Sequence, residues 1–502
     1  MTKNKKRVNI LSSNSDLTNY NLSVVFMFIG RKKEIAFLNK KYNSPNAEFI
    51  VIYGRRRVGK TETISEFCKD KPNLFFSCRE CTDIVQRENF SRAVLSFNTP
   101  AAEYVTTFND WGDAFSELAK IESDKKTVVV LDEFPYMCKG DKSIPSILQN
   151  LWDHVLSHSN IMLIISGSSV SFIEDELLGV KNPLYGRATG IYKMEPLPFV
   201  DAIKFFPNYS EEDKIIAYSI LGGIPHYLRQ FDPTATLEEN VKDQILSKGS
   251  VLFDEVEFML RQELRETSVY NTVIEAIALG NAAFNDIYLK VQIDKPKLSV
   301  YLKNLIDLGI IKREFPVLTS SNEKVNVNRG AYRLTDPFFR FWYAFVYNNL
   351  SLLEGGGIER VWRKKVQPNL HNFASKAFEE ISISFIRELD LQDKTPFEIS
   401  AIGRWWGNIT HYDENGKPFS SPEEIDILAC DEKEKNFIIG ECKFRNEAFD
   451  LHEFDKLKAK HERKGSIYYY LFSLGGFTDT VKNLVEKEKN IYLIEPSEMV
   501  NL

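Results

Sequence analysis

One octapeptide has the residue types and spacing of a phosphate-binding loop. It fits the pattern Gly-x-x-x-x-Gly-Lys-[Ser/Thr] and reads Gly54-Arg55-Arg56-Arg57-Val58-Gly59-Lys60-Thr61. The glycines allow backbone N–H groups to curl around an anion at the start of a helix. We expect Lys60 to reach the β- and γ-phosphates of a nucleotide and the Thr61 hydroxyl to hold Mg²⁺. The octapeptide therefore predicts binding of a nucleoside triphosphate.

Two acids further along the chain supply the second half of such a site. Asp132 and Glu133 directly follow residues 127–131, an apolar run rich in β-branched side chains. A run of this kind is typical of a buried parallel strand. We expect Asp132 to join the Mg²⁺ shell and Glu133 to orient and activate the water that attacks the γ-phosphate.

The surrounding elements predict how these residues are positioned. The octapeptide lies between the apolar residues 49–53 and the amphipathic residues 62–68, which indicates a strand, a tight loop and a helix. A third apolar run, residues 161–165, leads into Ser166-Gly167-Ser168-Ser169. Ser168 is placed to sense the γ-phosphate from a strand tip, and an ordinary turn is the alternative. The pattern predicts an α/β fold with a parallel sheet.

These stretches resemble AAA-type P-loop ATPases. The likeness is strongest to the archaeal and bacterial family that carries a C-terminal domain called DUF234, and it extends over nearly the whole chain from Met27 onward. The matching stretches are Phe28-Ile29-Gly30-Arg31-Lys32-Lys33-Glu34, Gly54 to Thr61, Val130-Leu131-Asp132-Glu133-Phe134-Pro135-Tyr136, Ser166-Gly167-Ser168, Pro183-Leu184-Tyr185-Gly186-Arg187, Gly222-Gly223-Ile224-Pro225-His226-Tyr227-Leu228 and Tyr332-Arg333-Leu334-Thr335-Asp336-Pro337.

The resemblance implies roles for three further residues. Gly30 and Arg31 become candidates for the adenine pocket, because the Gly-Arg segment of such ATPases lies near the base. Arg187 resembles an arginine finger, which stabilises transition-state charge on the nucleotide of a neighbouring subunit. That role implies a homo-oligomer, and an ordinary surface arginine is the alternative.

Two smaller units are expected after the ATPase core. Residues 197–262 alternate apolar and charged positions near helical period, which predicts a helical lid that closes over the nucleotide. Residues 263–340 predict three helices and a two-stranded wing, the pattern of a winged helix-turn-helix. Its third helix, residues 295–308, carries the residues expected to meet DNA: Lys295, Lys297 and Lys303 for phosphates, Ser299 and Tyr301 for bases. A winged helix that contacts only protein is the alternative.

The C-terminal segment carries a second set of acids beside a lysine. Asp426 lies in one expected strand, residues 424–430, and Glu441 and Lys443 lie in the next, residues 436–443. Two adjacent strands would bring both carboxylates close together, and Glu441 and Lys443 share a face because they are two residues apart.

This spacing resembles the PD-(D/E)xK nuclease superfamily, which has a restriction-endonuclease-like fold. The resemblance implies that Asp426 and Glu441 ligate Mg²⁺, that Lys443 stabilises or deprotonates the nucleophile, and that Glu379 is an additional helix-borne acid. Ile425 stands where the superfamily often has proline. An inactive nuclease-like binding module and a chance match are the alternatives. Trp405 and Trp406 either belong to the core or stack on a base.

Composition favours a cytoplasmic protein of several domains. The chain has 502 residues, 43% hydrophobic residues, a net charge of −6 and no long apolar run that predicts a membrane span. DNA binding therefore needs local basic patches. The expected domains are a disordered leader (1–26), the P-loop core (27–196), the lid (197–262), the winged helix-turn-helix (263–340), a connector (341–365) and the DUF234, nuclease-like domain (366–502).

The sequence thus predicts an ATPase that uses ATP and Mg²⁺ and couples nucleotide state to DNA binding and metal-dependent phosphodiester cleavage. A nucleotide-dependent switch, whose C-terminal domain only binds DNA or protein, is the alternative. A scaffold that binds nucleotide without turnover is a third reading, which the Asp132-Glu133 pair disfavours.

Overall fold

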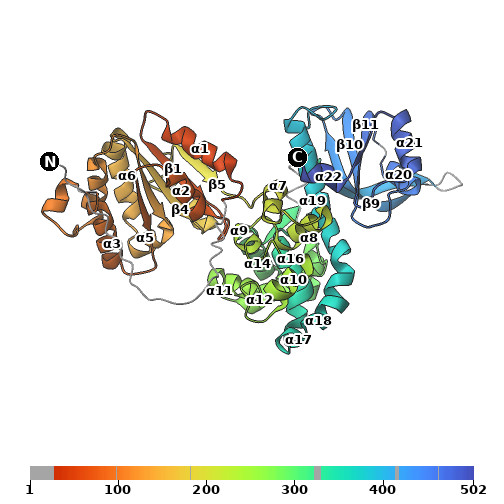
Figure 1. Cartoon of the computed structure of the whole chain (residues 1–502), viewed down its shortest axis with the longest axis horizontal. Coiled ribbons are helices and arrows are strands. Elements are labelled where there is room, and N and C mark those ends of the chain that lie inside the picture. Colours follow the sequence, from red (N-terminus) through yellow and green to blue (C-terminus); the bar gives the residue numbers. More distant parts are fainter. Residues whose placement is uncertain are drawn as a thin grey trace.

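The chain folds into two sheet-containing parts joined by a helical middle part (Figure 1). The computed structural model describes residues 28–97, 99–180, 182–320, 330–412, 418–461 and 463–501. The leader expected over residues 1–26 lies outside the described residues. In Figure 1 the N-terminal sheet lies at the left, the helical part at the lower centre and the C-terminal sheet at the right.

Five parallel strands form the N-terminal sheet in the order β2-β3-β4-β1-β5. Their bounds are β1 (Glu48–Tyr53), β2 (Asn73–Ser77), β3 (Thr127–Asp132), β4 (Ile161–Gly167) and β5 (Gly190–Lys193). Because all five strands run the same way, their carboxyl ends meet at one edge. β4 lies between β1 and β3, so the octapeptide after β1 and Asp132 at the end of β3 meet at this edge beside the tip of β4. The predicted parallel sheet is confirmed.

Both faces of this sheet are buried, as its continuous apolar strands require. Ile50 and Ile52 of β1 join one core, whereas Phe49 and Val51 join the core on the opposite face. The helices of this part are α1 (Lys32–Tyr42), α2 (Lys60–Cys68), α3 (Asp83–Leu95), α4 (Trp111–Ser116), α5 (Phe134–Gly140) and α6 (Ile144–His154).

Helices follow the sheet from Phe199 to Glu263, where the lid was expected. They are α7 (Phe199–Ala202), α8 (Glu211–Leu221), α9 (Pro225–Leu228), α10 (Leu237–Val241), the π-helix η6 (Lys242–Leu246) and α11 (Glu255–Glu263). Thr236 accepts from Glu239 N, and the Glu239 carboxylate accepts from Thr236 N at 2.8 Å, so a capping box starts α10. The core of this segment merges with one face of the N-terminal sheet.

Three helices and an antiparallel strand pair come next, in the order expected for a winged helix-turn-helix. They are α12 (Thr267–Ala278), α13 (Phe284–Val291), α14 (Lys295–Asp307), β6 (Ile311–Glu314) and β7 (Ala331–Leu334). Residues 321–329, between the two strands, lie outside the described residues.

The stretch expected only as a connector, residues 341–365, is helical and packed. It contains the end of α16 (Pro337–Phe341), the π-helix η7 (Trp342–Val346), α17 (Leu350–Glu354), α18 (Ile358–Val361) and most of the π-helix η9 (Trp362–Val366). Trp342 is fully buried and donates its indole N–H to Phe253 O at 2.7 Å. Its aromatic residues make this stretch part of the core rather than a loose link.

A mixed five-stranded sheet forms the C-terminal part in the order β12-β11-β10-β9-β8. Strands β8, β9 and β10 are antiparallel neighbours, and β10, β11 and β12 are parallel. The bounds are α19 (Leu370–Leu391), β8 (Ala401–Tyr412), β9 (Pro418–Cys430), β10 (Asn436–Lys443), α20 (Leu451–Ala459), β11 (Ser466–Ser473), α21 (Asp479–Lys487), β12 (Ile491–Ile494) and α22 (Pro496–Val500). The separate C-terminal α/β part is therefore confirmed.

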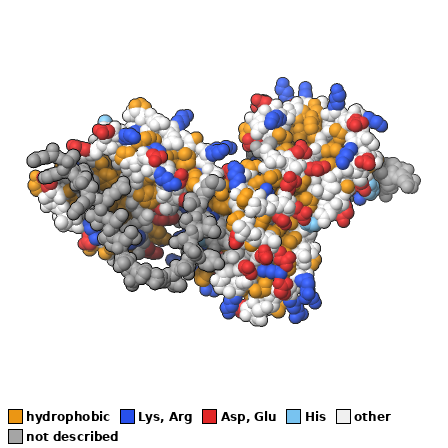
Figure 2. Space-filling view, in the orientation of Figure 1, with side chains coloured by type: hydrophobic (Ala, Val, Ile, Leu, Met, Phe, Trp, Pro, Cys, Tyr) orange, Lys and Arg blue, Asp and Glu red, His pale blue; other side chains and the backbone are white. Residues whose placement is uncertain are grey.

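Acidic and basic side chains are interspersed over the face of the molecule in Figure 2. This distribution agrees with the small net charge of −6. Within the described ranges, no helix is both long and apolar enough to cross a membrane.

Candidate functional site

The octapeptide forms the turn between β1 and α2, and α2 begins at Lys60. Gly54 has φ 151°, and a Cβ on it would collide with the carbonyl oxygen of Met194 beyond β5. Gly59 has φ 97°, which disfavours side chains with a Cβ. Both glycines of the motif are therefore required by the backbone path of the loop.

Lys60 and Thr61 point toward the carboxyl edge of the sheet. Lys60 Nζ donates to Gly54 O at 3.0 Å and to Arg55 O at 3.2 Å. Burial lowers the pKa of Lys60, although the nearby Glu133 and Asp132 carboxylates oppose this shift. Thr61 Oγ1 donates to Asp132 Oδ2 at 2.7 Å. The structure thus brings the hydroxyl and the first acid into direct contact.

Asp132 is buried at the end of β3, and each of its oxygens has a hydroxyl partner. The second partner is Ser166 Oγ at the tip of β4, which donates to Asp132 Oδ1. One hydroxyl and one carboxylate, all oxygen donors, are the ligand types that Mg²⁺ prefers. The donor set of Thr61 and Asp132 therefore fits this ion.

Glu133 lies one residue beyond the strand, in a left-handed conformation with φ 53°. Its Oε2 atom accepts from Ser168 Oγ at 2.9 Å and from Ser168 N at 3.2 Å. Ser168 therefore contacts the second acid and fixes where its carboxylate lies. The sequence pattern alone allows Ser168 to be either a phosphate sensor or an ordinary turn residue.

A cavity of about 470 Å³ lies above the octapeptide. One wall contains Lys60, Thr61 and Glu133, and the opposite wall comes from the helical segment, through His226 and Arg229. His226 lies in the family-like stretch from Gly222 to Leu228 and Arg229 directly follows it, but their positions in the sequence do not indicate a role at the loop. Only the docking of α9 against the loop brings them to the site.

Two residues of the helical segment, one neutral and one charged, line this cavity. Burial, with smaller effects from Arg57 and Arg229, lowers the pKa of His226 to about 4, so this ring is neutral at pH 7. Arg229 pairs with Glu62 in the first turn of α2. A neutral imidazole and a guanidinium at the wall of a cavity suit polyphosphate recognition.

The side chains of the octapeptide's three arginines pair with acids in later segments, and two of them, Arg56 and Arg57, also line the cavity. Arg56 Nε lies 2.7 Å from Glu263 Oε1. The other two pairs are Arg55 with Asp336 and Arg57 with Glu255. These ion pairs tie the loop to the helical segment that follows the sheet.

Arg31, expected near the adenine, is buried and bonded within the core. Its guanidinium donates to Glu195 O at 2.7 Å and to Val58 O at 2.5 Å, and it pairs with Glu34 at 2.8 Å. Gly30 has φ 74° and packs against Leu197, so a Cβ would crowd that side chain. Arg31 thus ties the octapeptide to the segment after β5.

Arg187, the candidate arginine finger, lies on a turn before β5. It forms ion pairs with Asp153, with Nε at 3.0 Å from Oδ1 and Nη2 at 2.9 Å from Oδ2. Its Nη1 atom donates to Pro183 O at 2.8 Å. Arg187 is not among the residues that line the cavity above the octapeptide.

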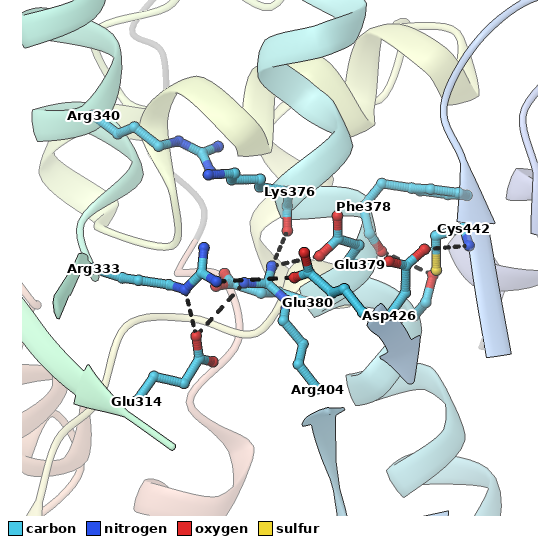
Figure 3. Close-up of polar contacts among 12 residues, drawn as sticks. Glu314, Arg333, Arg340, Lys376, Phe378, Glu379, Glu380, Arg404, Asp426 and Cys442 are labelled. Carbon is cyan, nitrogen blue, oxygen red and sulfur yellow. Dashed lines mark hydrogen bonds and ion pairs between the residues drawn. The ribbon is translucent and has the colours of Figure 1, made fainter. Parts of the chain in front are cut away.

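The C-terminal sheet brings Asp426 and Glu441 together. The antiparallel register ends with Gly440 opposite Ile427, and Glu441 and Asp426 are the next residues along the two strands. Cys442 N donates to Asp426 Oδ2 at 2.9 Å, a bond drawn in Figure 3. Burial, reinforced by the Glu441 charge, raises the pKa of Asp426 to about 6.

Two lysines hold Glu441. Lys443 Nζ lies 2.5 Å from Oε1 and Lys460 Nζ lies 2.9 Å from Oε2. The second lysine was missed because it follows α20, where no sequence pattern links it to β10. Lys460 also lines a cavity of about 420 Å³ with Trp405, His461 and other residues.

Glu379, the expected helix-borne acid, is engaged by an arginine. It lies on α19 near Asp426, but its Oε2 atom pairs with Arg404 Nη2 at 2.7 Å (Figure 3). Burial raises the pKa of Glu379 to about 8. No cluster of three or more His, Cys, Asp or Glu side chains suited to a metal occurs among the residues that the structure describes. The C-terminal site therefore has two neighbouring carboxylates, those of Asp426 and Glu441, while the Glu379 carboxylate is paired with Arg404.

The candidate DNA-contacting residues lie on the exposed side of α14. Lys295, Lys297, Ser299 and Lys303 are exposed, while Leu298, Leu302 and Leu305 are buried beneath them. Tyr301 differs, because its hydroxyl donates to Glu266 and its ring packs against Tyr270 at 4.7 Å between centroids. The lysines are thus accessible, whereas Tyr301 is held by neighbouring residues.

Known proteins identify the two ends of the chain. Residues 28–231 match a family described as an ATPase domain predominantly from Archaea, and residues 342–462 match DUF234, described as archaeal and bacterial proteins of unknown function. An uncharacterized protein of Methanocaldococcus jannaschii is 31% identical over 420 residues, covering 84% of this chain and 88% of the relative. The chain belongs to this family of archaeal ATPases with a DUF234 domain.

Two solved structures are similar to this member of the family over about two thirds of its length. The Walker-type ATPase of Pyrococcus abyssi is 21% identical, with a TM-score of 0.47, and the match covers 63% of this chain and 96% of that one. The ORC2 protein of Aeropyrum pernix, in complexes with ADPNP and ADP, is 12% identical, with a TM-score of 0.41. That match covers 66% of this chain and 95% of the ORC2 chain.

Proposed function

We propose that this ATPase hydrolyses Mg·ATP at the cavity above the octapeptide. The observation that carries the proposal is the contact of Thr61 with Asp132, beside Lys60 and Glu133, at one edge of the parallel sheet. Lys60 would bind the β- and γ-phosphates, and the backbone N–H groups of the loop would cradle them. Glu133 would accept the proton of the attacking water, held in position by Ser168.

Thr61 and Asp132 would hold the magnesium ion. When bound, Mg²⁺ would neutralise phosphate charge and orient the β- and γ-oxygens. The lid would complete the site through His226 and Arg229, which face the same cavity. Arg187 would act on the nucleotide of a neighbouring copy in a homo-oligomer.

The test is phosphate release and nucleotide binding by the full chain. Lys60→Ala is expected to weaken ATP binding and to abolish phosphate release. Lys69→Ala is the matched control, since this lysine at the end of α2 is 65% exposed and pairs only with Glu66 among the ion pairs of the described chain. Equal phosphate release by the wild-type protein and Lys60→Ala would contradict the proposal.

We further propose that the C-terminal part cleaves phosphodiesters. The supporting observation is the proximity of Asp426 and Glu441 on adjacent strands, where the Glu441 charge helps to raise the pKa of Asp426 and Lys443 pairs with Glu441. Asp426 and Glu441 would hold a divalent ion, which would supply a hydroxide nucleophile and polarise the phosphate. Lys443 would stabilise the developing charge, and Lys460 would contact the phosphate from the adjoining cavity.

The lysines on α14 would bring the nucleic acid to this site. Lys295, Lys297 and Lys303 are exposed on one helix, in a unit with the element order of a winged helix-turn-helix. Nucleotide state would then control access of DNA to the C-terminal acids.

A nucleotide-dependent switch that binds DNA or protein without cutting is the second candidate. It is favoured by the Glu379 pairing with Arg404, which leaves two carboxylates at the C-terminal site. Supercoiled, linear and single-stranded DNA, each with Mg²⁺ or Mn²⁺ and with or without ATP, separate the two. Cleavage lost in Asp426→Asn but kept in the α20 control Asp455→Asn supports the nuclease. No cleavage, with binding retained, supports the switch.

A further inference from the structure

Three consecutive arginines of the phosphate-binding loop connect it to segments outside the matched ATPase region. We call this set the arginine clamp. It comprises the pairs Arg55 with Asp336, Arg56 with Glu263 and Arg57 with Glu255. Glu255 and Glu263 lie at the two ends of α11, and Asp336 lies just before α16, all beyond residue 231, where the ATPase match ends.

The clamp is built largely from buried charges. The side chains of Asp336 and Glu255 are each 1% exposed. Burial raises the pKa of Glu255 even though Arg57 and Arg55 oppose the shift. A carboxylate this deeply buried is costly without a partner, so separating α11 from the loop would leave uncompensated charges on both sides.

Asp336 acts on two elements at once. Its Oδ2 atom pairs with Arg55, while its Oδ1 atom accepts from Phe338 N at 2.7 Å and from Phe339 N at 3.2 Å, which caps α16. The Arg55 guanidinium also lies 5.3 Å from the centre of the Phe339 ring. One carboxylate therefore fixes both the loop and the first turn of the helix.

The loop itself is held in an unusual conformation at the same place. Arg57 has φ 69°, a left-handed conformation that is uncommon for a residue with a Cβ. Its pairing with Glu255 tethers this residue to α11. Because the loop's backbone N–H groups are the ones that meet phosphates, a shift of α11 or α16 would change how those groups point.

We propose that Asp336 is a positioning residue of the ATP site, and that the arginine clamp couples nucleotide affinity to the placement of α11 and α16. This inference rests on ATP binding at the loop. Coupling of this kind is reciprocal, so nucleotide binding would in turn bias the position of α16 and of the helices that lead from it to α19. The clamp thus provides a physical link between the ATP site and the C-terminal half.

The test is a double-mutant cycle read by titration with a fluorescent ATP analogue in Mg²⁺. Asp336→Asn keeps the α16 cap, because asparagine also caps helices, and removes only the charge. Arg55→Gln removes the other partner. Each single variant is expected to weaken nucleotide binding about tenfold, and the double variant no further than the weaker single one. Arg55→Lys is expected to restore part of the affinity.

Matched variants distinguish a loss of loop positioning from a general loss of folding. Glu255→Gln is expected to weaken binding, whereas Glu257→Gln on the same helix is not, because Glu257 pairs with the exposed Arg261. The half-buried Arg56 and Glu263 pair allows a charge swap, and Arg56→Glu with Glu263→Arg is expected to bind better than either single change. Thermal unfolding is measured for every variant, so that a loss of nucleotide binding is counted only for variants that are folded.

Hydrogen exchange supplies a readout independent of turnover. In the wild-type protein, adding nucleotide should change the exchange of the Phe338 and Phe339 amides, and Asp336→Asn should abolish that change. Additive effects in the cycle, or affinity unchanged within twofold while the melting temperature falls, would overturn the inference. If the wild-type protein itself does not bind the analogue, the proposed ATP site fails instead.

Discussion

The hydroxyl of Ser168 donates a 2.9 Å hydrogen bond to Oε2 of Glu133, and the Ser168 backbone N–H donates to the same oxygen at 3.2 Å. The tip of β4 therefore positions the acid that follows β3. A mutation of Ser168 removes the bond from the hydroxyl but keeps the bond from the backbone N–H. The effect of the side chain on the position of Glu133 is therefore measurable by itself.

Ser168→Ala is expected to lower the turnover number about tenfold, since the catalytic carboxylate loses one of two bonds that orient it. Nucleotide affinity should change little, because Ser168 acts on Glu133 rather than on Lys60 or Thr61. Steady-state phosphate release measures both quantities. Ser169→Ala, one residue further, is the control, and an equal loss in both variants would argue against positioning by Ser168.

Arg229→Gln is expected to slow hydrolysis by about tenfold or more, because a guanidinium at the cavity wall would stabilise charge on the γ-phosphate. The binding of ADP, which lacks that phosphate, should be affected less than the binding of ATP. Comparing the two affinities checks this point. If ADP and ATP binding weaken equally, Arg229 does not discriminate the γ-phosphate.

His226 gives the fold a specific acid sensitivity. Burial, aided by Arg57 and Arg229, lowers its pKa to about 4, below the ordinary value of about 6.5. The unfolded chain therefore binds more protons between these pH values, and stability falls as pH drops from about 6.5 toward 4. His226→Gln should reduce that fall by roughly 1–2 kcal/mol.

Urea unfolding at pH 7 and pH 4.5 measures this difference. The exposed His154 provides the control substitution, His154→Gln, which should leave the pH dependence as it is in the wild-type protein. The same loss of stability in His226→Gln and in the wild-type protein would show that His226 is not responsible.

Lys460 is expected to compete with a divalent ion for Glu441, because its ammonium lies 2.9 Å from Oε2. Lys460→Met should therefore raise the affinity for Mn²⁺ several-fold, since one cation leaves the site, while Asp426→Asn should lower it. Calorimetric titration without nucleotide measures both. Weaker Mn²⁺ binding by Lys460→Met would contradict the competition.

Local patterns predicted most of the elements, and they did so for physical reasons. The alternation and turn residues around Asp426 and Glu441 were sufficient to place them on adjacent strands, because an antiparallel register depends on local sequence. Strand β8 begins only at Ala401, after a short segment without strand pairing. Residues before it are held by Asp390, whose Oδ1 atom accepts from Ile399 N at 3.1 Å.

The contacts between distant segments were beyond sequence reasoning. Nothing near Arg55 indicates Asp336 as its partner, because a single ion pair leaves no periodic pattern in either segment. His226, Arg229 and Lys460 were missed for the same reason. The stretch around Trp342 was expected only as a connector, because its short helical pieces, including π-helices, lack the long period that marks a helix.

The central claim, ATP hydrolysis with Glu133 as the base, is tested most directly by single-turnover hydrolysis in the wild-type protein and in Glu133→Gln. Glutamine keeps the size of the side chain but does not accept the proton. The account predicts ATP binding within a few-fold of wild type and hydrolysis slowed about 100-fold or more. Hydrolysis by Glu133→Gln at the wild-type rate, with ATP bound normally, would contradict it.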